Sequence, residues 1–233
     1  MLAAIITIVV VSAALIVGAL WGIFGKMSNG VEGFIIAAAG GALMVSAILE
    51  LVDPATEVAG VFPAIAMMMV GAVVFTALDY LVDNVWQSTG GTGLLVAITL
   101  DGVPENLALG VSLIGSGPLQ VAALAGSILL SNLPEAAGGA KQMTDTLGKN
   151  KTLGLWIATA VILAASALAG RLFLTEVSDD ALALIRSFAG GAVIASLATE
   201  VFPKAFKEDH LLAGIATALG LAAATWLQSL SGG

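Results

Sequence analysis

Three carboxylates interrupt apolar segments in the middle of the chain. Asp101 and Glu105 are four residues apart, so a helix places both on one face. Glu135 lies in the next apolar segment, and Ser131 precedes it at the same spacing, with Asn132 beside it. An unpaired charge inside a bilayer costs at least about 2.5 kcal/mol. These side chains therefore need a chemical reason to be there.

Buried acids can be protonated, paired with a basic group, or neutralised by a bound cation. The two segments contain no Lys, Arg or His before Lys141, so we expect no internal ion pair. A cation, or protons exchanging with one, remains as the explanation. Pro104 and Pro134 each remove an N–H from a helix. We expect the freed carbonyl oxygens of Leu100 and Leu130 to add to an all-oxygen set of ligands.

Simpler interpretations of these residues stay open. The prolines could only bend their helices, with the acids bonded to nearby hydroxyl groups. Ser131 and Asn132 could join neighbouring helices, as small polar residues often do in membranes. Among the other acids, we place Glu200, which lies in a later apolar segment, in the site or on its access path.

The composition predicts an all-α membrane protein that must position these residues. Of 233 residues, 59% are hydrophobic and 10% are charged, whereas soluble domains carry roughly 25% charged residues. The absence of cysteine excludes disulfides and thiolate metal sites, and the net charge of −8 argues against a nucleic-acid partner. A span takes about 20 residues, and we predict a single transmembrane domain, residues 1–233, with helices at about 2–25, 32–52, 60–82, 92–115, 119–141, 152–173, 183–203 and 210–230.

Basic residues indicate how these eight helices are oriented. Six of the eight basic residues fall in alternate connections, which predicts that both termini lie outside the cytoplasm. We therefore expect a multi-pass protein of the cytoplasmic membrane, with the lipid bilayer as its partner and a homodimer as one assembly to test. The six are Lys26, Lys141, Lys149, Lys151, Lys204 and Lys207.

Two internal similarities predict a repeated architecture. Residues 39–50 recur at 189–200, with Ala-Gly-Gly-Ala, a Ser and a final Glu in the same places. Val-Pro-Glu at 103–105 resembles Leu-Pro-Glu at 133–135. Both pairs lie on predicted helices that cross the membrane in opposite directions. We expect three helices on each side of a central pair, a 3+2+3 inverted repeat, which is typical of transporters.

The two Pro-Glu segments resemble the ZIP (Zrt/Irt-like) family of divalent-metal transporters. That family's fourth span typically reads His-Asn-x-Pro-Glu-Gly, and its fifth reads His- or Gln-Asn-x-Pro-Glu-Gly. The corresponding segments here are Asp-Gly-Val-Pro-Glu-Asn at 101–106 and Ser-Asn-Leu-Pro-Glu-Ala at 131–136. The resemblance covers nearly the whole chain, including a Glu followed by Pro in the seventh span. It implies a metal site formed by Asp101, Glu105, Ser131, Asn132, Glu135 and Glu200.

Departures from the family pattern change the expected metal. Asp101 stands in place of a histidine, Gly102 in place of an asparagine, and residues 152–173 lack the acid that binuclear members carry in the sixth span. We therefore expect one oxygen-rich site rather than two. Such ligands favour Mn²⁺, Fe²⁺ or Mg²⁺ over zinc, although carboxylates also bind Zn²⁺ and Cd²⁺.

The predicted function is transport of a divalent cation, without catalysis or a prosthetic group. The cation would enter from outside, bind between the fourth and fifth helices, and leave to the cytoplasm as one bundle moves against the other. One alternative is a ZIP-like protein that has lost metal transport and carries another solute or senses ions. An intramembrane lipid pyrophosphatase is disfavoured, because phosphate chemistry needs basic residues near the acids.

Overall fold

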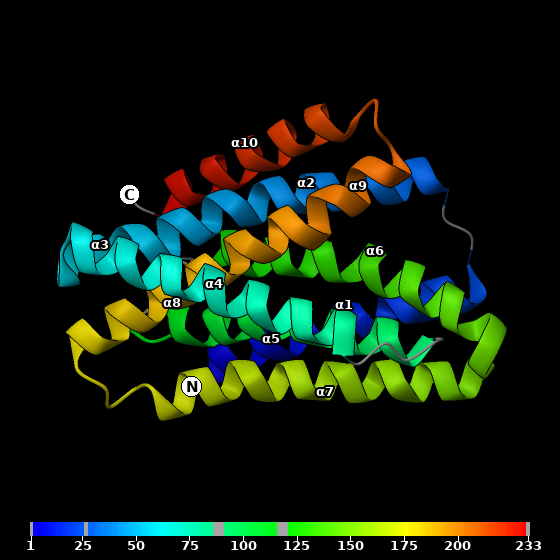
Figure 1. Cartoon of the computed structure of the whole chain (residues 1–233), viewed down its shortest axis with the longest axis horizontal. Coiled ribbons are helices and arrows are strands. Elements are labelled where there is room, and N and C mark those ends of the chain that lie inside the picture. The colour runs from blue at the N-terminus through cyan, green and yellow to red at the C-terminus, as the bar shows by residue number, and fades with distance from the viewer. Residues whose placement is uncertain (1, 26–27, 86–90, 116–120, 232–233) are drawn as a thin grey trace.

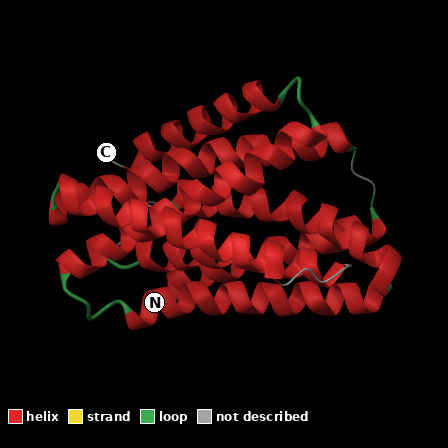
Figure 2. Cartoon of the chain, in the orientation of Figure 1, coloured by secondary structure: helices red, strands yellow, loops and turns green. Residues whose placement is uncertain are grey.

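The computed structural model describes residues 2–25, 28–85, 91–115 and 121–231. Helices make up 92% of the structure, and the described residues contain no strand (Figure 2). The all-helical class predicted from composition is therefore confirmed. The first residues of the chain and the end of its last helix lie toward the same end of the bundle, and the α6–α7 and α9–α10 connections lie at the other (Figure 1).

The helices follow one another through short connections. Two π-helical turns interrupt longer helices: η1 (Ile48–Val52) joins α2 to α3, and η2 (Leu197–Val201) joins α8 to α9. The α-helices are α1 (Leu2–Phe24), α2 (Asn29–Ala47), α3 (Asp53–Ala59), α4 (Val61–Val85), α5 (Gly91–Ser112), α6 (Ala122–Leu147), α7 (Lys149–Phe173), α8 (Asp179–Ser196), α9 (Phe202–Glu208) and α10 (Ala213–Ser231).

Within the described residues, six helical segments are long and apolar enough to cross a membrane: α1, α2 through α3, α4, α7, α8 through α9, and α10. They fit a multi-pass membrane protein. The predicted fourth and fifth spans are the helices α5 and α6, which are not among the six. The polar residues of α6, among them Ser127, Asn132 and Glu135, lower its hydropathy, and the same residues make it a candidate for function.

Two helical segments that contain π turns end later than predicted. The expected spans 32–52 and 183–203 continue as helix to Ala59 and Glu208. Pro54 and Pro203, each two residues beyond a π turn, supply no N–H to the preceding turn. The backbone shifts its register instead: the N–H of Asp53 bonds to the carbonyl of Ile48, five residues back, and Phe202 bonds to Leu197 in the same way. The ends of α5 and α6 also differ from prediction, at Ser112 and Leu147.

Glycines bring helices of the N-terminal half close to helices of the C-terminal half. α2 packs on α10, and α8 packs on α4. A Cβ on Gly41 would overlap the carbonyl oxygen of Thr217, and a Cβ on Gly191 would overlap that of Met68. These two glycines belong to the repeated Ala-Gly-Gly-Ala motif. Small residues allow such backbone contacts, which replace the hydrophobic driving force that lipid does not supply between helices.

The two central helices each have a close partner and contact each other. α1 packs on α6, α7 packs on α5, and α5 contacts α6. The main apolar core lies where α1, α2, α5, α6 and α8 meet, and includes Leu43, Leu109, Leu124, Ile128 and Val193. The outward faces of α4, α7 and α10 expose large apolar side chains. Exposed apolar faces of this extent fit contact with lipid.

Candidate functional site

Glu105 lies in the interior of α5 and is 4% exposed. Pro104 precedes it inside the helix, as predicted. Asn106, which follows it, is completely buried; its amide nitrogen donates to the carbonyl of Gly102 at 2.8 Å, and its Oδ1 has no hydrogen-bond partner. A buried acceptor without a partner costs about 1–3 kcal/mol. Sequence analysis did not select Asn106, although its position directly after Pro-Glu in an apolar helix was a usable signal.

The α6 residues of the predicted site also face the protein interior. Ser131 and Asn132 are buried, and Glu135 is partly exposed. The Ser131 hydroxyl donates to the carbonyl of Ile128 at 3.0 Å, while the amide nitrogen of Asn132 has no partner. The serine oxygen keeps lone pairs for a further contact, and rotation of the Asn132 amide would present an oxygen instead of a nitrogen. Both residues thus have coordination capacity left.

Glu135 lies close enough to Lys204 and Glu200 for their charges to act on it. Lys204 comes from α9 and Glu200 from η2, far away in the sequence. The expectation that the two central helices supply no ion pair considered those helices alone. The positive charge that acts on Glu135 comes instead from Lys204 on a neighbouring helix. The predicted site residues Glu135 and Glu200 are brought together.

Other predicted members are less closely grouped. The backbone of Asp101 lies in α5, but its side chain is outside the described residues. Among the side chains that are described, no three His, Asp or Glu residues form a group that could hold a metal ion. The described site is therefore a pair of carboxylates, Glu135 and Glu200, with Glu105 on the adjoining helix α5.

Glu50, the sequence counterpart of Glu200, has a structural contact. Its Oε1 accepts a hydrogen bond from the N–H of Leu124 at 3.0 Å, in the first turn of α6. A carboxylate at a helix N-terminus satisfies a free N–H and interacts favourably with the helix dipole. Arg186 does the converse for α5, donating to the carbonyls of Val111 and Ile114 at 3.3 and 3.1 Å. Glu50 and Arg186 thus bind the helix ends that flank the α5–α6 connection.

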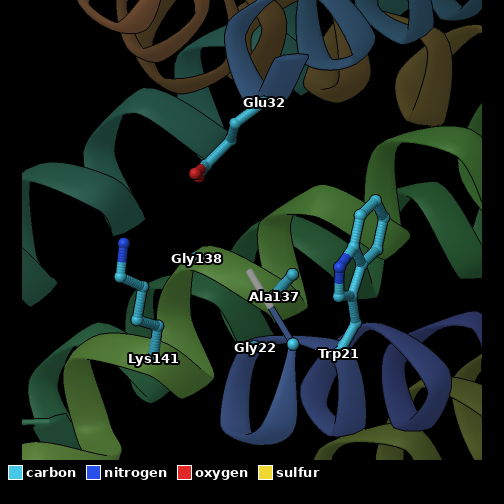
Figure 3. A pocket seen from close by; sticks show the side chains of 7 residues that line it. Trp21, Gly22, Glu32, Ala137, Gly138 and Lys141 are labelled. Carbon is cyan, nitrogen blue, oxygen red and sulfur yellow. The ribbon is translucent and has the colours of Figure 1, made fainter. Parts of the chain in front are cut away.

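A second feature lies beside Glu135, toward the α6–α7 end. Glu32 of α2 forms an ion pair with Lys204, with 3.8 Å between Oε1 and Nζ. The charge of Lys141 also acts on Glu32. Glu32 and Lys141 reach into a cavity of about 270 Å³ between α1, α2 and α6 (Figure 3). Sequence analysis missed Glu32, because an acid in the first turn of a helix is ordinary.

The comparison with protein-family models and the comparison with curated proteins found no match for this chain. The chemistry of the site therefore rests on its own residues. Carboxylates and amide oxygens are hard ligands, which suit Mg²⁺, Mn²⁺ and similar cations.

Proposed function

We propose that this chain is a carrier for divalent metal cations in the cytoplasmic membrane. The observation that carries the proposal is the pair of carboxylates at Glu135 and Glu200: the charge of Glu200 acts on Glu135, and so does the ammonium group of Lys204. Ionisable groups within a membrane protein mark ion and proton paths by default. A cation bound between the two carboxylates would relieve the repulsion between their charges.

The unpaired amide oxygen of Asn106 supports an oxygen-rich site on α5. Its amide nitrogen is anchored to its own helix, so the oxygen is held in a fixed direction. A bound cation would supply the missing partner, together with the adjacent Glu105. Such a donor set favours Mn²⁺, Fe²⁺ or Mg²⁺ and also accepts Zn²⁺ and Cd²⁺.

We further propose eight spans in a 3+2+3 inverted repeat of the ZIP type. Matching contacts support it: α1 packs on α6 as α7 packs on α5, and α2 packs on α10 as α8 packs on α4. The π turns η1 and η2 interrupt α2 and α8 at nearly the same place in each repeat. In such carriers, one bundle moves against the other around a site near the middle of the membrane.

Uptake into proteoliposomes tests this function. Vesicles that contain wild-type protein should accumulate Mn²⁺, Fe²⁺, Zn²⁺ or Cd²⁺, followed with a fluorescent chelator inside. Glu105→Gln and Glu135→Gln should each lower the rate by about a hundredfold, the loss expected when a buried charged contact is removed. Glu57→Gln, an exposed acid of α3, is the matched control and should transport normally. Uptake at the wild-type rate in both site variants would overturn the proposal.

A further inference from the structure

Charged side chains from α6, from α2 and from the segment that runs from η2 into α9 form two levels, and α2 packs on both α6 and α9. Glu135 and Gly138 are three residues apart on α6, so they share a face. Glu200 and Lys204 are four apart on the segment that runs from η2 into α9 and also share a face. Glu135 and Glu200 make the inner level. Gly138 and Lys204 lie one turn farther toward the α6–α7 end, about 5 Å along the helix.

Glu32 belongs to this outer level. A Cβ on Gly138 would overlap Oε1 of Glu32, so the glycine leaves the space that this carboxylate occupies. The same Oε1 is the atom paired with Lys204. Lys141 and Glu208 are the other charges that act on Glu32. The carboxylate is largely buried, 13% exposed, and stands beside the cavity between α1, α2 and α6.

Lys204 is therefore placed between two sets of acids. Its Nζ lies 3.8 Å from Glu32, at the outer limit for an ion pair, and its charge also acts on Glu135. A lysine side chain is a mobile point charge on four methylene groups. When all four groups are ionised, Glu32, Glu135 and Glu200 together with Lys204 have a formal net charge of −2, which one divalent cation would neutralise.

We propose that Lys204 is a built-in counter-ion that alternates between Glu32 and the Glu135–Glu200 pair. A divalent cation binds Glu135 and Glu200 as the ammonium group moves out to Glu32. The return of the ammonium group to the inner acids expels the cation toward the cavity and the α6–α7 end. Lys204 is thus a positioning residue that sets cation affinity and release. This inference rests on the proposed function.

A purely structural role of the Glu32–Lys204 ion pair predicts a different change in cation affinity. If the Glu32–Lys204 pair only joins α2 to α9, removal of either partner leaves the other unpaired and loosens the same contact. Both single variants would then change cation affinity in the same direction. The counter-ion role predicts opposite directions, because loss of Lys204 frees the inner acids while loss of Glu32 leaves Lys204 with them.

Equilibrium binding of Mn²⁺ to the purified full-length chain in detergent tests the inference, with free Mn²⁺ measured by its EPR signal and Cd²⁺ run in parallel. Lys204→Met should bind about tenfold more tightly and Glu32→Gln about tenfold more weakly than wild type. The double variant should behave like Lys204→Met, and Lys204→Arg should restore affinity near the wild-type value. Lys207→Met removes an exposed lysine from the same helix and should change nothing.

Two results would contradict the counter-ion role of Lys204. One is that both single variants shift Mn²⁺ affinity in the same direction. The other is that Lys204→Met has the same Mn²⁺ affinity as Lys207→Met. If Lys204→Met does not fold, Glu32→Gln still decides, since unchanged or tighter binding contradicts the inference. A wild-type chain that binds neither Mn²⁺ nor Cd²⁺ overturns the proposed function as well. Normal binding by wild type with no effect at Lys204 overturns the counter-ion alone.

Discussion

The two ends of the central helices use charged residues in different ways. At the α5–α6 connection, Glu50 bonds to the N-terminal turn of α6 and Arg186 bonds to the carbonyls at the end of α5. At the α6–α7 end, Glu32 and Lys204 pair loosely beside a cavity, next to Glu135. The charged groups at the first end bond to helix termini. Those at the second end interact with one another, and we propose that they bind a cation.

The difference arises within two similar segments. Glu50 is the third residue of its π turn and Glu200 the fourth. A shift of one residue along a helix rotates the direction of the side chain by about a quarter of a turn around the helix axis. The two carboxylates therefore face different neighbours. The register that aligns Glu50 with Glu200 puts Pro54 in place of Lys204 and Leu182 in place of Glu32. The two halves thus share backbone contacts and differ in chemistry.

The largest effect is expected where the two halves are most alike. Gly41→Leu and Gly191→Leu each force a side chain into a backbone carbonyl of the facing helix. Each should lower the free energy of unfolding by about 3 kcal/mol or more, the upper range for overpacking. Thermal unfolding in detergent measures this loss. A large loss at one glycine with none at the other would break the likeness between the halves.

The helix-end contacts should affect stability and leave binding unchanged. Glu50→Ala removes the acceptor of a buried N–H, and Arg186→Met removes the donor to two carbonyls. Each should cost about 1–3 kcal/mol of unfolding free energy. Mn²⁺ affinity should stay within twofold of wild type, or about 0.4 kcal/mol. Loss of Mn²⁺ binding in Glu50→Ala, with the fold intact, would place Glu50 in the site.

Glu200→Gln tests the acid that corresponds to Glu50 in the second half of the chain. It should weaken Mn²⁺ binding about tenfold or more, because one of two paired carboxylates loses its charge. The unfolding temperature should fall less than in Glu50→Ala, because the substitution also removes the repulsion between Glu135 and Glu200. Denaturation and Mn²⁺ titration of the same preparation give both values. A stability loss as large as that of Glu50→Ala would indicate that both acids are structural.

Asn106→Leu separates binding from folding on α5. The variant removes a buried amide oxygen that has no partner, so stability should hold or rise. Mn²⁺ affinity should fall by about tenfold if that oxygen is a ligand. An affinity equal to that of wild type would remove Asn106 from the site.

The smallest effect is expected at a glycine with free space around it. Apart from the neighbouring backbone of its own helix, no atom of the described residues lies within 4 Å of a Cβ placed on Gly154 in α7. Gly154→Ala should therefore stabilise the helix by about 0.4–1 kcal/mol through a less flexible unfolded chain. A destabilised variant would show that α7 has a contact at this face. The stability change in Gly191→Leu therefore reports the cost of steric overlap between helices. The change in Gly154→Ala reports the gain from a less flexible unfolded chain.

Local sequence signals predicted the helices and the Pro-Glu positions well, because apolar runs and prolines act within one segment. The π turns were not predicted, although Pro54 and Pro203 indicate that regular α-helical hydrogen bonding is interrupted there. Residues brought together by packing could not be predicted from spacing. The charge of Lys204 acts on Glu135 from α9, and Glu50 of η1 bonds to Leu124 of α6. Both contacts depend on how helices distant in sequence pack.

The most direct test of the proposed site counts bound cations. Equilibrium dialysis with Mn²⁺ should give about one ion per wild-type chain, consistent with one oxygen-rich site. The double variant Glu105→Gln/Glu135→Gln should bind none, while Glu50→Gln should bind as much as wild type. The same stoichiometry in all three proteins, or none in any, would contradict a cation site between α5 and α6.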